Sequence, residues 1–85
     1  MDAKFSNRAR KALEILVDGG RFEYRLERDG YTGFEKFRYR LKTEKGSIVK
    51  GIGHSTFYEL ERAGYLAARY EAATSISTPY YLRKA

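Results

Sequence analysis

The sequence predicts one small α+β domain across residues 1–85, in which two helices pack on an antiparallel sheet. Its 85 residues are enough for a single domain. Apolar residues recur with helical spacing at 9–17 and at 57–63, whereas residues 21–27 and 36–42 alternate between apolar and polar side chains as strands do. A content of 42% hydrophobic and 15% aromatic residues supports a compact core. The expected order of elements is α-β-β-β-α-β-β.

The first helix is expected between Ser6 and the glycine pair Gly19-Gly20. Either Ser6 or Asn7 can cap its first turn by accepting a backbone hydrogen bond, and glycine favours the left-handed conformation that ends helices. The apolar positions follow the i, i+3, i+4, i+7, i+8 pattern of one helix face. The residues expected to face the core are Ala9, Ala12, Leu13, Leu16 and Val17.

Three strands are expected after this helix, joined by two turns. Residues 21–27 alternate in polarity, and the loop at 28–33 contains an Asp-Gly turn signal. The second strand is expected at 34–43 and the third at 47–52, separated by a tight turn at 44–46. Two hairpin connections in series predict an antiparallel meander.

The second helix is expected to begin near Ser55 or Thr56, because Thr56 and Glu59 have the spacing of a capping box. Gly64 then leaves two alternatives. The helix can continue to residue 73, since the intervening segment is rich in good helix formers.

Alternatively, the helix stops at Gly64 and residues 65–71 form a strand. The segment at 78–82 is expected to be the last strand, and it needs a partner that residues 65–71 can supply. The break at Gly64 is therefore favoured.

The composition argues against several classes of function. The absence of cysteine excludes disulfides, thiolate metal sites and thiol catalysis, and it favours the cytoplasm. No apolar run approaches the roughly 18 residues that span a membrane. His54 is the single histidine, which is too few for a zinc site, and no nucleophile and carboxylate are set around it by the sequence. We expect no catalytic residues, no metal, no cofactor and no membrane partner.

An excess of 17 Lys and Arg over 11 Asp and Glu gives a net charge of +6, which attracts polyanions. Within the second predicted strand, Phe37, Tyr39 and Leu41 are expected to face the core. The alternate positions form what we call the cationic row: Lys36, Arg38, Arg40 and Lys42. These side chains repeat every roughly 6.6–6.8 Å, which is comparable to the phosphate spacing along one nucleic-acid strand. The row therefore predicts phosphate binding. The alternative is a solvated face that carboxylates on the neighbouring strands neutralise, namely Glu23, Glu27 or Glu35.

Residues 50–56 place two glycines before hydroxyl side chains at a helix start. Helix N-termini bind anions through their free N–H groups, so Lys50, Ser55 and Thr56 are predicted to add a phosphate contact. The alternative is an ordinary turn followed by a helix cap.

Eight tyrosines exceed the needs of a small core, and tyrosine is favoured at interfaces. Tyr80 and Tyr81 point to opposite faces of a strand, so at least one of them is expected to be exposed. Because of the tyrosine excess, both are predicted to take part in an interaction. The alternative is that they pack within the sheet.

Residues 47–83 resemble the latter part of a winged helix-turn-helix domain, in which a short strand, a helix, a glycine-containing exit and a two-stranded wing follow one another. The resemblance implies a helix at 55–63 and a wing formed by 65–70 and 78–83. It also implies major-groove recognition by Ser55, Thr56, Tyr58 and Arg62.

The order α-β-β-β-α over residues 6–73 is also similar to a double-stranded-RNA-binding domain. Residues 51–55 resemble the glycine-rich entry to the second helix of that family. The family's lysine cluster corresponds to positions 56, 57 and 60, which are threonine, phenylalanine and leucine in this chain.

Two hypotheses of function follow. The first is binding of DNA or RNA through the cationic row and the entry to the second helix. The second is binding of a protein, either another copy of this chain or a larger partner, through Tyr80 and Tyr81 or an open sheet edge.

Overall fold

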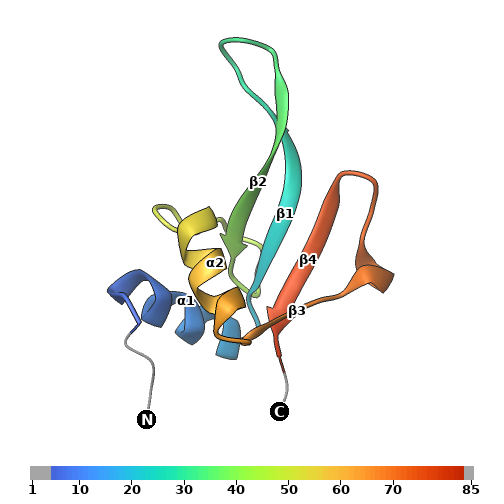
Figure 1. Cartoon of the computed structure of the whole chain (residues 1–85). Helices are drawn as coiled ribbons and strands as arrows, with labels where there is room; N and C mark the ends of the chain where they lie inside the picture. The colour runs from blue at the N-terminus through green and yellow to red at the C-terminus, as the bar shows by residue number, and fades with distance from the viewer. Residues whose placement is uncertain (1–4, 84–85) are drawn as a thin grey trace.

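The computed structural model of the chain describes residues 5–83. In this part of the chain two helices lie on one face of a four-stranded antiparallel sheet with the order β2-β1-β4-β3 (Figure 1). The predicted α+β class is confirmed. The elements are α1 (Asn7–Val17), β1 (Arg21–Arg28), β2 (Glu35–Lys42), α2 (His54–Arg62), β3 (Leu66–Ala68), the 3-10 turn η1 (Tyr70–Ala72) and β4 (Ser77–Leu82).

The predicted first helix is confirmed, and Ser6 is its cap. The Ser6 hydroxyl accepts a hydrogen bond from the backbone N–H of Ala9 at 3.1 Å. It also donates to the Glu59 carboxylate at 2.8 Å, which ties the start of α1 to α2. The helix ends at Val17 with Asp18 as its C-cap, and Gly19 follows with a φ of +102° that suits glycine. Val17 was expected in the core but is 69% exposed, because it lies on the last turn at the margin of the buried face.

The second helix begins one residue earlier than predicted, at His54, with Gly53 as its N-cap. The capping box expected from Thr56 and Glu59 does not form. Thr56 lies inside the helix and is only 2% exposed, and Glu59 accepts hydrogen bonds from Ser6 instead. The spacing of Thr56 and Glu59 matches a capping box, but Thr56 is buried in the core and Glu59 contacts Ser6, so neither side chain caps α2.

The strand predicted at 47–52 is reduced to a single bridge between Lys42 and Ile48. The Val49 N–H donates to the Leu41 carbonyl at 2.8 Å, so the segment touches only the end of β2. Gly51, with a φ of +85°, then turns the chain towards α2. The β-branched residues favour a strand locally, but the short connection to α2 leaves no length for one.

The predicted break at Gly64 is confirmed: its φ is +83°, and β3 follows and pairs with β4. β4 also pairs with β1, so the C-terminal strand completes the sheet between two elements that are far apart in sequence.

The core lies between the helices and the sheet, with Phe57 of α2 at its centre. The Phe57 ring lies 3.9 Å from the ring of Tyr39, 4.9 Å from that of Tyr80 and 5.5 Å from that of Phe22, measured between centroids. The buried apolar residues are Ala9, Ala12, Leu16, Phe22, Leu41, Ile52, Phe57, Leu60 and Leu66.

The β1–β2 hairpin extends beyond both helices, as Figure 1 shows at its upper end. Exposure therefore rises along the helix-facing side of the hairpin, from 0% at Leu41 to 45% at Phe37 and 101% at Tyr31 in the tip. Phe37 was expected in the core. It lies on the predicted side of β2, but α2 is too short to cover it. The hairpin consequently presents side chains to solvent on both faces.

Candidate nucleic-acid interface

The cationic row lies on the sheet face opposite the helices, where it stands beside the polar positions of β1. We call this surface the open face; in β1 and β2 it holds six cationic and two acidic side chains. The register places Arg38 opposite Arg25, and Arg40 opposite Glu23. The residues of the open face are Arg21, Glu23, Arg25, Glu27, Lys36, Arg38, Arg40 and Lys42.

Glu27 forms ion pairs with three arginines of the open face. Arg40 binds it through two hydrogen bonds, with Nε at 3.0 Å and Nη2 at 2.9 Å from the carboxylate oxygens. Arg25 and Arg38 each approach the same carboxylate at 3.8 Å. The hydrogen bonds from Arg40 lower the pKa of Glu27, and they outweigh the opposite effect of burial.

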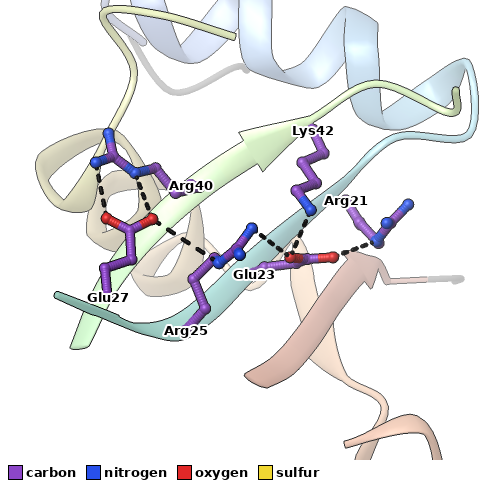
Figure 2. A network of polar contacts seen from close by, with 6 residues as sticks. All are labelled: Arg21, Glu23, Arg25, Glu27, Arg40 and Lys42. Carbon is purple, nitrogen blue, oxygen red and sulfur yellow. Dashed lines mark hydrogen bonds and ion pairs between the residues drawn. The ribbon is translucent and has the colours of Figure 1, made fainter. Parts of the chain in front are cut away.

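Glu23 is buried to 9% exposure beneath its cationic neighbours. Lys42 Nζ and Arg21 Nε lie 3.1 Å and 2.9 Å from its carboxylate, and Arg25 Nη1 lies at 3.6 Å. Burial raises the pKa of Glu23, but the hydrogen bonds from Lys42 and Arg21 lower it by more. Figure 2 shows Arg25 between the two carboxylates, so the ion pairs form one connected network.

The lowered pKa values of Glu23 and Glu27 fix the direction of the pH effect. Each pair contributes stability above the ordinary glutamate pKa, and this contribution is lost as the pH falls through the lowered value. At neutral pH both carboxylates are charged, so the cations that contact them are held in place.

The predicted neutralisation of the cationic row takes place only in part. Glu23 and Glu27 pair with members of the row, whereas Glu35 pairs with Arg28 at 3.3 Å. Two carboxylates against six cations leave four positive charges in excess. Among the described residues Lys36 takes part in no ion pair. The open face is therefore both ordered and strongly positive.

A second feature is a groove on the helix-facing side of β2. Because β2 is at the edge of the sheet, no strand of residues 5–83 flanks its first six positions. A groove of about 400 Å³ runs along this edge; we call it the edge groove. Its aromatic walls come from β1, β2 and the start of α2, namely Tyr24, Phe37, Tyr39, His54 and Tyr58. Its remaining lining comes from Lys36, Arg38, Arg40 and Gly53.

The rings of the edge groove pack against one another. Tyr24 stacks on Phe37 with centroids 4.8 Å apart and an interplanar angle of 19°. Tyr39 lies edge-on to Tyr58 at 5.6 Å. Phe37 and Tyr58 are each 45% exposed. Sequence reasoning assigned Phe37 and Tyr39 to the core and missed the groove. The sequence contained one signal of the groove. The hairpin strands and the helix expected to cover them have similar numbers of residues, but a strand rises more than twice as far per residue as a helix. The strands therefore extend beyond the helix and leave part of their apolar face uncovered.

The other predicted phosphate contacts are not brought together with the open face. Lys50 is exposed in the loop before α2, and Ser55 and Arg62 are exposed on α2, which covers the opposite side of the sheet. Thr56 is buried. Lys50, Ser55 and Arg62 are therefore not part of the open face, although Gly53 and His54 at the entry to α2 line the edge groove together with three members of the cationic row.

Tyr80 and Tyr81 point to opposite faces, as predicted. Tyr80 packs edge-on against Phe57, and burial raises its pKa. On the other face, the Arg69 guanidinium lies over the Tyr81 ring, 4.8 Å from its centroid. Both side chains are partly buried within the sheet layers. Their role as an interaction surface stays a prediction.

Two further observations concern residues 5–83. No group of three or more acidic, histidine or cysteine side chains in this range is arranged to hold a metal ion. No helix in the same range has both the length and the apolar character needed to cross a membrane.

The winged-helix and double-stranded-RNA-binding resemblances stay predictions. No protein-family model matches the chain, and no match is found among the curated proteins or the solved structures.

Proposed function

We propose that the protein binds nucleic acid, without catalysing a reaction on it, through the open face of the β1–β2 hairpin. The observation that carries the proposal is the excess of four positive charges on one ordered surface. Contacts between such side chains and phosphates position a nucleic acid without reading its sequence.

The excess charge has no evident benefit for folding. Arg25 and Arg38 lie directly opposite each other on neighbouring strands, and like charges in that position destabilise a sheet. Two carboxylates need only two cationic partners. A row of phosphates would relieve the remaining repulsion, which is the physical reason to expect a polyanionic ligand.

The cations of the open face differ in how closely the carboxylates engage them. Arg40 donates two hydrogen bonds to the Glu27 carboxylate, so its guanidinium is engaged within the protein. Lys36 is exposed and without an ion pair in the described part of the chain, and Arg38 has only a long contact of 3.8 Å. These two residues are the ones most available to phosphates.

The proposal predicts a steep dependence of binding on salt. About four phosphate contacts give a slope of log affinity against log salt near −3 to −4, or about a hundredfold loss of affinity between 50 and 200 mM salt. The measurement is a titration of the purified protein against short duplex DNA, duplex RNA and single strands at both salt concentrations. Poly-glutamate is the control polyanion. Absence of binding to every nucleic acid at 50 mM salt, or equal binding to poly-glutamate, would contradict the proposal.

Glu27→Gln separates a binding surface from a purely structural network. Loss of the carboxylate frees Arg38 and Arg40 and adds one positive charge, so we expect nucleic-acid affinity to rise by about three- to tenfold at 50 mM salt. The free energy of unfolding should fall by about 1 kcal/mol, since the lost pair is partly exposed and screened by solvent. Affinity is measured by fluorescence anisotropy and stability by urea denaturation.

The matched control is Glu14→Gln on α1, which changes the net charge equally on an exposed side chain of the helix layer. An equal rise in affinity in both variants would show that only the total charge matters. A fall in affinity for Glu27→Gln would show that the network, rather than the freed arginines, makes the contacts.

The proposal also places the protein in the cytoplasm. Nucleic acids are accessible there, and domains without disulfides are the rule in that compartment.

A further inference from the structure

We infer that the ligand is single-stranded nucleic acid and that the edge groove takes its unpaired bases. This inference rests on the proposed function, because the phosphates of the same strand are to be held by the cationic row. It adds a class of ligand and a second contact surface, made of aromatic rings.

The edge groove offers ring surfaces in positions where a base can reach them. Phe37 and Tyr58 stand on different elements, β2 and α2, and each is 45% exposed. Tyr24 stacks on Phe37 and so supports that ring from the β1 side. The volume of about 400 Å³ is within the roughly 300–1,000 Å³ of sites that bind small molecules. Exposed aromatic rings beside cations are the usual means by which proteins bind single strands.

β2 supplies both kinds of contact: cationic side chains for the phosphates and aromatic rings for the bases. Its cationic and aromatic side chains alternate, and Lys36, Arg38 and Arg40 line the same groove as the rings. Because β2 is an edge strand, a nucleic-acid strand that follows it meets phosphate-binding groups on one side and ring faces on the other. A duplex cannot use the rings, since its bases are already stacked and paired.

A second copy of this chain is a poorer occupant of the edge. Pairing two β2 strands would bring one cationic row beside another, and neighbouring like charges destabilise a sheet. Charge complementarity therefore favours a polyanion, and the exposed rings favour one whose bases are free.

The test compares oligonucleotides that carry the same phosphates with and without accessible bases. The probes are end-labelled single strands of about ten thymidines or ten uridines, a duplex of the same length, and an abasic strand of the same length, all at 50 mM salt. We expect both single strands with bases to bind at least about tenfold more tightly than the abasic strand, because stacking on one or two rings has that magnitude. Comparing the affinities of the thymidine and uridine strands shows whether the protein prefers DNA or RNA.

Phe37→Leu and, separately, Tyr58→Leu should each weaken binding of the strands with bases by about five- to tenfold and leave binding of the abasic strand and the salt slope unchanged. The two substitutions lie on different elements, so a folding defect in one does not remove the test. Tyr70→Leu is the control, because Tyr70 is 74% exposed and does not line the edge groove. A circular dichroism spectrum verifies that each variant is folded.

The outcomes distinguish this inference from the proposed function. Equal affinity for intact, abasic and duplex probes, with a steep salt dependence, would overturn the role of the edge groove and leave phosphate binding by the open face in place. No binding to any probe would overturn both.

Discussion

Replacing Lys36 and Arg38 with glutamate is expected to lower nucleic-acid affinity about a hundredfold or more at 50 mM salt. Each phosphate contact contributes about one order of magnitude at this salt concentration, and the substitution removes two contacts and introduces repulsion. Lys36 and Arg38 are chosen because they contribute little to the internal ion pairs. Lys36 makes none with the described residues, and the single contact of Arg38 is 3.8 Å long.

The fold should tolerate this double substitution. Lys36 lies opposite Glu27 and Arg38 lies opposite Arg25, so one new carboxylate gains a cationic neighbour and the other faces Glu27. The free energy of unfolding should change by less than about 1 kcal/mol, the range of exposed pairs.

The control for total charge is Arg8→Glu with Lys11→Glu, which makes the same change on exposed positions of α1. We expect it to reduce affinity far less, because only long-range attraction is altered and salt screens it within about 10 Å at 0.1 M. Equal losses in the two double variants, measured by anisotropy at 50 and 200 mM salt, would remove the open face as the site of binding.

The largest effect on stability is expected for Phe57→Ala, which should lower the free energy of unfolding by about 3–5 kcal/mol. Phe57 is 2% exposed and contacts the rings of Phe22, Tyr39 and Tyr80, so its removal leaves a cavity where α2 meets three strands. Small domains are stabilised by only about 5–15 kcal/mol in total.

Urea denaturation monitored by circular dichroism measures this effect, and Tyr70→Ala is the control. Tyr70 is 74% exposed, so its truncation should change stability by less than about 0.5 kcal/mol. A loss below about 1.5 kcal/mol for Phe57→Ala would mean that α2 does not pack on the sheet as described.

Local patterns in the sequence were sufficient to predict the helices, the β1–β2 hairpin and the break at Gly64. Each depends on side-chain period or on a glycine with positive φ. The segment at 47–52 was mispredicted as a full strand, because its β-branched residues indicate a strand whereas the path to α2 limits it to one bridge at Ile48. Val17 fits the apolar period of α1 but lies past the edge of the core.

The candidate site was predictable on one face of β2 only. Strict alternation identified the cationic row, and the possible pairing with Glu23 and Glu27 followed from strand neighbours. The edge groove was not predictable from the period, because Phe37 is placed on the correct side of the strand and is exposed only by the limited reach of α2. Exposure of that kind depends on tertiary arrangement.

The position of β4 beside β1 has a consequence for the order of folding. Phe22 pairs with Tyr80, so this contact must close a chain segment of more than fifty residues, whereas β1 and β2 are joined by the short loop at 29–34. Closure entropy grows with loop length and slows contacts between distant residues. We therefore expect the β1–β2 hairpin to form early and β4 to join late. On a ribosome, the residues of the open face would emerge before the strand that completes their sheet.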